Sequence, residues 1–139
     1  KDFAFKKTAK EKFDMMVIDT PPGTHCNVVQ SLRSADLALA VTEPTPLGIY
    51  DLDLMLKLTT KLKIPTCVII NKADVPGCDK HGVLDVVKRY ESEIIAEVPF
   101  DKKIFQTSVE GNPFMKRYPE SVVSKAFMKV AESVLFLTS

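Results

Sequence analysis

The stretch Thr66-Cys67-Val68-Ile69-Ile70-Asn71-Lys72-Ala73-Asp74 changes abruptly from an apolar run to polar residues. An apolar run without alternation is typical of a strand that is buried on both faces of a parallel sheet. Similar runs occupy residues 37–42, before this stretch, and residues 94–98, after it, and another occupies residues 13–19. We therefore predict a sheet of about four strands, each with an apolar interior.

Segments with apolar residues at helical spacing lie between and after these runs. They cover residues 47–63, which Pro65 terminates, residues 83–93 and residues 121–137. Strands that alternate with helices, without a hairpin turn between them, predict right-handed crossovers and hence a parallel sheet. The predicted fold class is α/β: an open parallel sheet with flanking helices.

The composition is that of an ordinary globular protein. Of the 139 residues, 45% are hydrophobic and 27% are charged, which suits a single domain with a buried core. The net charge of +1 gives no electrostatic case for binding nucleic acid or an anionic membrane. No apolar run reaches the roughly 18–20 residues of a membrane-spanning helix, and no secretory peptide is evident. The odd number of cysteines, without a CxxC pair, favours a reducing cytoplasm.

Polar or turn-forming residues follow each predicted strand. Ligands of an open parallel sheet bind at the carboxyl ends of its strands, so these residues form the candidate site. They are Asp19, with Thr20, Pro21, Pro22 and Gly23; Glu43, Pro44 and Thr45; Asn71, Lys72 and Asp74; and Pro99, Phe100 and Asp101.

Asp19 is the candidate catalytic and magnesium-facing residue. A carboxylate directly after a buried strand can hold a hydrated Mg²⁺ ion, through water, beside the phosphates of a nucleotide. The prolines that follow cannot continue a strand, and Gly23 allows a sharp turn and a close approach of the backbone to a phosphate. The alternative is that Asp19 merely caps the following turn.

Asn71 is the candidate contact for a purine base, because its side-chain amide carries both donors and an acceptor. The alternative is an ordinary strand-ending turn, in which Asn and Asp are common. Residues 71–74 also have the form NKxD, in which the Asp of a GTPase pairs with the donors of guanine. The spacing from Asp19 to Gly23 is DxxxG, however, whereas GTPases usually show DxxG. GTP binding therefore stays the alternative to ATP binding.

These motifs occur in an order that resembles one known family. The segments 13–23, 34–45, 64–65, 71–72, 98–101 and 110–113 are similar, in that order, to the MinD/ParA/Mrp superfamily of P-loop ATPases. The resemblance implies a partial P-loop NTPase (Rossmann-like) domain over residues 13–139, with residues 1–12 as a connector. The chain is most similar to the branch with a ferredoxin insert before this segment, although the CxxCxxCxxxCP cysteines of that insert are absent here.

The resemblance also implies roles for the candidate residues, with ATP and Mg²⁺ as cofactors. Asn71 contacts adenine, the backbone of residues 99–101 closes over the base, and residues 20–23 form the switch segment. Glu43, Pro44 and Thr45 lie near the interface of a nucleotide-dependent homodimer. The alternative for these residues is a rigid loop that leads into the helix predicted over residues 47–63. The expected partner is an iron–sulfur or redox protein, with an iron–sulfur cluster in the missing insert.

A phosphate-binding GxxxxGK[ST] loop is absent from the sequence, since none of the five glycines begins one. Without its amide groups and its lysine, tight nucleotide binding and hydrolysis are not expected. We therefore expect a fragment that is inactive alone and comes from an ATPase. An alternative of another class is a non-catalytic protein-interaction module. The pairs His25 with Cys26, and Cys78 with His81, are incomplete metal sites, and we expect no metal at either.

Overall fold

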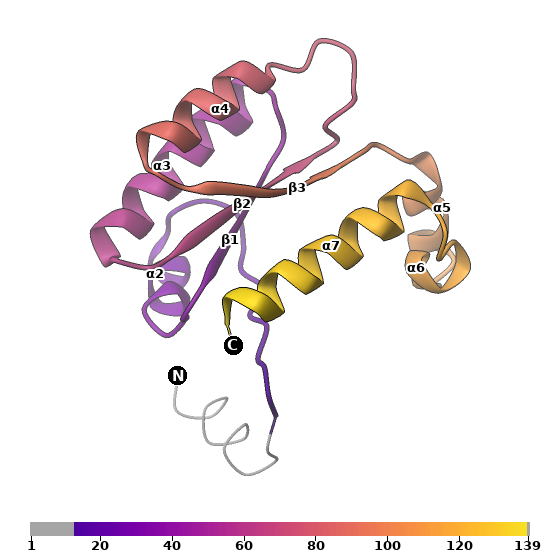
Figure 1. The fold of residues 1–139 in the computed structure, drawn as a ribbon, viewed down its shortest axis with the longest axis horizontal. Helices are drawn as coiled ribbons and strands as arrows, with labels where there is room; N and C mark the ends of the chain where they lie inside the picture. Colours follow the sequence, from indigo (N-terminus) through magenta and orange to yellow (C-terminus); the bar gives the residue numbers. More distant parts are fainter. Residues whose placement is uncertain (1–12, 139) are drawn as a thin grey trace.

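The computed structural model describes residues 13–138, so the predicted connector at residues 1–12 lies outside the described residues. Helices and strands alternate through most of the chain, as predicted (Figure 1). In chain order they are α2 (Cys26–Leu32), β1 (Ala38–Thr42), α3 (Pro46–Leu62), β2 (Thr66–Asn71), α4 (Lys80–Arg89), β3 (Glu93–Val98), α5 (Lys102–Val109), α6 (Phe114–Arg117) and α7 (Val122–Leu137).

The sheet is parallel, with the strand order β1-β2-β3. β2 is the central strand, and its four interior residues, Cys67 to Ile70, are all buried. The unbroken apolar run predicted this burial, because a central strand of a covered parallel sheet is buried on both faces. The predicted α/β fold class and the strands at residues 37–42, 66–71 and 94–98 are therefore confirmed.

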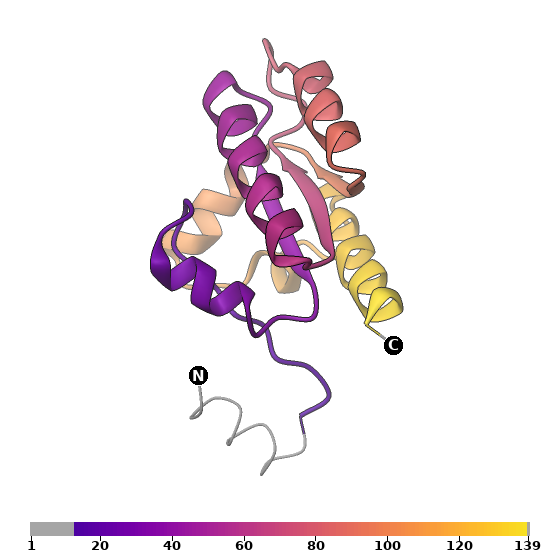
Figure 2. The ribbon, with the colours of Figure 1, turned by 90° about the vertical axis from the view of Figure 1, so that its left-hand side faces the viewer.

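Helices cover both faces of the sheet, which gives three layers (Figure 2). α3 and α4 cover one face, where Leu56 and Val83 are fully buried against Val68 of β2. α7 lies along β3 on the opposite face, and its Val123 packs with Ile69 of the central strand. α2 lies beside β1 at the edge of the sheet. Apolar area removed from water on both faces is the main stabilising term of such a sheet.

The predicted strand at residues 13–19 is wrong. The segment is extended coil beside the sheet, and Phe13 and Val17 are 57% and 84% exposed. A strand forms only where a neighbour accepts and donates its backbone hydrogen bonds. Within residues 13–138, β1 pairs only with β2, and no strand pairs with this segment. The described sheet therefore has three strands rather than about four.

The helix predictions differ mainly at the ends. α3 begins after Thr45, whose Oγ1 accepts a hydrogen bond from the backbone N–H of Gly48, and it ends at Lys63, whose φ is 56°. The helix predicted over residues 83–93 instead begins at Lys80 and ends at Arg89. Glu91 stands in the left-handed region, with φ of 53°, and turns the chain into β3. The prediction over residues 121–137 is confirmed by α7, whereas α2, α5 and α6 were not predicted.

Candidate functional site

Three loops of the candidate site meet at one edge of the sheet. The loops that follow β1, β2 and β3 begin at the carboxyl ends of parallel, neighbouring strands. An ion pair and several hydrogen bonds join these loops to one another. The sequence placed these loops together correctly, although it did not predict the contacts between them.

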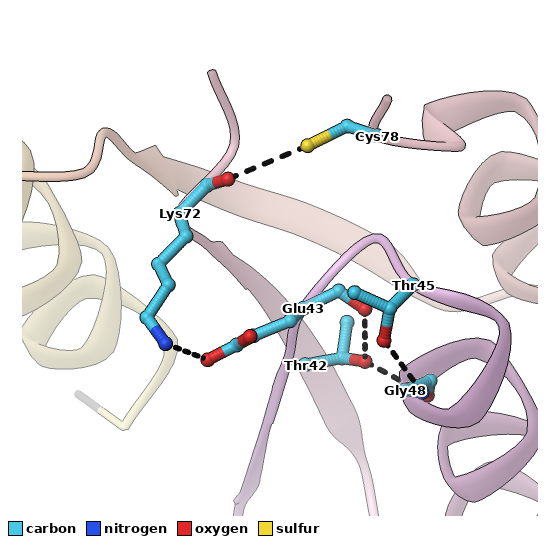
Figure 3. A network of polar contacts seen from close by, with 6 residues as sticks. All are labelled: Thr42, Glu43, Thr45, Gly48, Lys72 and Cys78. Atoms are coloured by element: carbon cyan, nitrogen blue, oxygen red, sulfur yellow. Dashed lines mark hydrogen bonds and ion pairs between the residues drawn. The ribbon is translucent and has the colours of Figure 1, made fainter. Parts of the chain in front are cut away.

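The loop after β1 is held tightly against the first turn of α3. Thr42 Oγ1 donates to the backbone oxygen of Gly48 at 2.9 Å, and Thr45 Oγ1 accepts from the Gly48 N–H at 3.1 Å (Figure 3). A Cβ atom at Gly48 would lie 2.2 Å from the backbone oxygen of Glu43, so only glycine allows this approach. The backbone of Glu43 is therefore fixed by its surroundings.

The loop after β2 faces the loop after β1. Lys72 Nζ lies 2.7 Å from Glu43 Oε1, and both side chains are about half exposed. The backbone N–H of Asp79 donates to the oxygen of Pro44 at 2.9 Å, and Cys78 Sγ donates to the oxygen of Lys72 at 3.6 Å. A small pocket of about 100 Å³ lies between the two loops, lined by residues 43–45 and by Lys72, Val75, Pro76, Gly77 and Cys78.

The loop after β3 is tied to the loop after β2 from the other side. Asp74 Oδ1 accepts a hydrogen bond from the Phe100 N–H at 2.6 Å, and the Ala73 N–H donates to the oxygen of Val98 at 3.0 Å. Asp101 caps α5, since its Oδ1 accepts from the Lys103 N–H at 2.8 Å. These bonds leave the ring of Phe100 54% exposed.

The arrangement presents groups that suit a planar heterocyclic base. Asn71 pairs in register with Val98, so its side chain stands at the start of the loop that carries Pro99 and Phe100. Its half-buried amide forms no hydrogen bond with any residue in the described range, so its donors and acceptor are available. An exposed ring and a free amide can stack on and hydrogen-bond to a base, which makes the residues present compatible with adenine.

Lys72 and Asp74, both predicted to bind nucleotide, are engaged with protein groups. The Lys72 ammonium pairs with Glu43, and one oxygen of Asp74 accepts the Phe100 N–H. Sequence reasoning missed both contacts. The Glu43–Lys72 contact could have been predicted from the sequence, because these opposite charges directly follow two strands that are neighbours in a parallel sheet.

Asp19 and the predicted switch segment stand apart from these contacts. Asp19 is exposed, and within residues 13–138 it forms no hydrogen bond or ion pair with the three loops. Gly23 adopts φ of 93°, in agreement with the predicted sharp turn. No group of three or more His, Cys, Asp or Glu side chains in the described part of the chain could hold a metal ion. A lone carboxylate fits the predicted water-mediated contact to Mg²⁺, and it does not fit a complete protein-made metal site.

The cysteines occupy different environments. Cys26 is exposed, Cys78 is half-buried and Cys67 is buried, and all three are free thiols. Burial, and after it the nearby Glu93 carboxylate, raises the pKa of the Cys67 thiol above its usual value. Among the described residues, neither Cys26 nor Cys78 belongs to a group of three or more potential metal ligands. Over the same residues, the helices are too short or too polar to cross a membrane.

Comparison with known proteins gives relatives that share most of this chain. An uncharacterised protein of Methanocaldococcus jannaschii is 37% identical over 103 residues, which cover 74% of this chain and 34% of that protein. An iron–sulfur cluster carrier protein of Pyrococcus furiosus is 29% identical, covering 89% of this chain and 46% of that protein. The chain thus spans less than half the length of these curated relatives.

The solved structures support the same fold and the same family. The septum site-determining protein MinD of Pyrococcus horikoshii, solved with Mg-ADP, superposes with a TM-score of 0.77 at 27% identity, covering 92% of this chain and 53% of that chain. The predicted resemblance to the MinD/ParA superfamily is therefore confirmed. The family model of the NUBPL iron-transfer P-loop NTPases, of the ParA type, matches residues 2–135. With almost its whole length matched, this chain belongs to the NUBPL-type iron-transfer P-loop NTPases.

Proposed function

We propose that this chain is the base-binding and magnesium-facing part of an ATPase that carries iron–sulfur clusters. The observation that carries the proposal is the carboxyl edge of β2 and β3, where Asn71, whose amide forms no hydrogen bond within residues 13–138, pairs in register with Val98, two residues before the exposed Phe100. This arrangement supports a role for Asn71 in contacting the base and for residues 99–101 in closing over it. Family membership supports the nucleoside triphosphate as the ligand.

The contacts of Asp74 favour adenine over guanine. In NKxD recognition of guanine, the Asp carboxylate accepts hydrogen bonds from the N1 and N2 donors of the base. Here Asp74 Oδ1 accepts the Phe100 N–H at 2.6 Å, which ties this oxygen to the base-closing loop and leaves Oδ2 to face two donors of guanine. Adenine has no donor at N1, and the Asn71 amide can satisfy its donor and acceptor edge without help from Asp74.

Asp19 supplies the catalytic carboxylate of the proposal. The chemistry that bound Mg²⁺ would supply is neutralisation of the negative charge on the nucleotide phosphates. Asp19, exposed after its extended segment, would hold a water of that ion, and residues 20–23 would respond as the switch. The GxxxxGK[ST] loop is absent from these 139 residues, so we propose that another part of the protein supplies the phosphate-binding groups.

The iron–sulfur cluster is proposed as cargo rather than as a cofactor bound by this segment. The Pyrococcus furiosus relative is named an iron–sulfur cluster carrier protein, and the matching family is named for iron transfer. The described residues offer no metal-binding group of their own. We therefore propose that the cluster is held elsewhere in the protein or at its interface with an iron–sulfur or redox partner. Glu43 and Thr45 are proposed to contact a second copy, whereas the predicted contact by Pro44 is not proposed because its side chain is fully buried in this chain. The free thiols support a cytoplasmic location.

Competition binding on the full-length protein tests the proposal. With a fluorescent ATP analogue as the probe, ATP should compete at least about tenfold better than GTP, roughly 1.4 kcal/mol. Asn71→Ala should lower ATP affinity, because it removes the proposed base contact, whereas Asn27→Ala should leave it unchanged, because Asn27 is exposed on α2. Equal or reversed preference for GTP, or an unaffected Asn71→Ala variant, would rule out the adenine assignment.

A further inference from the structure

Residues 72–79 form a bridging loop that contacts both of the other loops. On one side, Lys72 pairs with Glu43 and the Asp79 N–H donates to the oxygen of Pro44. On the other side, Asp74 accepts the N–H of Phe100. The proposed partner loop, residues 43–45, is therefore linked through the bridging loop to the proposed base-closing loop, residues 99–101. These contacts join the two outer loops beyond the ends of the paired strands.

Both members of the Glu43–Lys72 ion pair are held by their own backbones. Lys72 adopts φ of 52°, in the left-handed region that residues other than glycine seldom occupy, and its oxygen accepts the Cys78 thiol. The oxygen of Glu43 accepts from the Thr45 N–H at 2.8 Å. Figure 3 shows the two side chains extended toward each other from loops of neighbouring strands. The fixed backbones hold the starting points of the two side chains at a set separation.

We propose that the Glu43–Lys72 ion pair is a positioning element that couples the base site to the partner loop, so that ATP-dependent association with a second copy depends on it. This inference rests on the proposed function, and it gives Lys72 a role through Glu43 instead of a direct contact with nucleotide. The ion pair sets the distance between the partner loop and the bridging loop. The Asp74–Phe100 hydrogen bond then relates the bridging loop to the base.

The expected size of the effect follows from the exposure of the pair. With side-chain exposures of 45% and 40%, the pair is partly screened by solvent, so its loss should weaken ATP-dependent association by about threefold to fivefold. Glu43→Gln, Lys72→Gln and the double variant should each show the same loss, because all three remove one shared interaction. The reversed pair Glu43→Lys with Lys72→Glu should restore most of the association. High salt should weaken the ATP-dependent association of the wild type to near the level of the variants.

The experiment uses the full-length protein, with its mass followed by light scattering over a range of concentrations in Mg-ATP and in Mg-ADP. ATP affinity is measured in the same samples with the fluorescent analogue. The matched control is Arg89→Gln, which removes an ion pair of similar length, 2.6 Å to Asp53, between α4 and α3. This control should associate like the wild type.

Each outcome decides a different claim. Equal losses in the two single variants and in their combination, with rescue by the reversed pair, would support the coupling. Unchanged association in the single variants, additive losses, or failure of the reversed pair to rescue would overturn it. A wild type that binds ATP without ATP-dependent association would also overturn the coupling, while leaving nucleotide binding intact. A wild type that does not bind ATP would overturn the proposed function itself.

Discussion

Replacement of Gly48 by alanine tests how tightly the partner loop packs against α3. Gly48 is the third residue of the helix, where alanine by itself would favour the helical state by up to about 1 kcal/mol. The added Cβ atom, however, would lie 2.2 Å from the backbone oxygen of Glu43 and 3.1 Å from Thr42 Oγ1. Because a backbone atom cannot rotate away, the loop has to shift, at an overpacking cost of about 1–3 kcal/mol. We expect Gly48→Ala to be destabilised by a net amount of about 1 kcal/mol.

Gly82→Ala is the matched control for this prediction. Gly82 is likewise the third residue of its helix, α4, and its N–H likewise donates to the N-cap side chain, that of Asp79. A Cβ atom there would meet Asp79 Oδ2 at 2.6 Å and Ile49 Cδ1 at 2.7 Å, which are ends of side chains that can rotate. Urea denaturation of the chain, followed by circular dichroism, should therefore place Gly48→Ala below Gly82→Ala in stability. The reasoning fails if Gly48→Ala is as stable as Gly82→Ala or more stable than the wild type.

Four further outcomes are expected. In the full-length protein, Asp19→Asn should keep much of the ATP affinity and lose Mg-dependent turnover by on the order of 10²-fold, and near-normal turnover would show Asp19 to be a turn cap only. The 139-residue chain alone should bind Mg-ATP no better than about millimolar in calorimetry and should self-associate in light scattering, whereas micromolar binding by a monomer would contradict this. A thiol reagent should label Cys26 first, Cys78 next and Cys67 only on unfolding. Folding raises the pKa of the Cys67 thiol, so the unfolded state loses the thiol proton at a lower pH than the folded state does. The free energy of unfolding should therefore fall as the pH rises past 9.0, and in the Cys67→Ala variant it should fall less steeply.

Much of the fold could be predicted from local sequence pattern. The apolar runs that became β1, β2 and β3 are long enough to mark strands, and the run at residues 66–71 matched β2 throughout. The helices predicted from apolar spacing at residues 47–63 and 121–137 begin within one residue of α3 and α7. The order of the strand-end motifs was enough to indicate the family, which the match over residues 2–135 then confirmed.

The same kind of pattern failed where a partner element decides the outcome. Residues 13–19 are as apolar as β2, but a strand also needs a neighbour for its backbone hydrogen bonds, and among the described residues none pairs with this segment. The short helices α5, of eight residues, and α6, of four residues, were missed because they are shorter than the window of about 11–18 residues in which a helical period can be recognised.

The sequence by itself determined that the loops after β1, β2 and β3 gather at the carboxyl edge of the sheet, because parallel neighbouring strands end at the same edge. It also placed Asp19 and residues 20–23 there, but within residues 13–138 their segment pairs with no strand. It did not determine what those residues contact. In the sequence, Lys72 and Asp74 follow the pattern of nucleotide-binding residues. Only the tertiary structure shows that Lys72 pairs with Glu43 and that Asp74 accepts a hydrogen bond from the Phe100 N–H. The physical reason is distance along the chain. Local propensity acts over a few residues, whereas these contacts join loops that only the packing of the strands brings together.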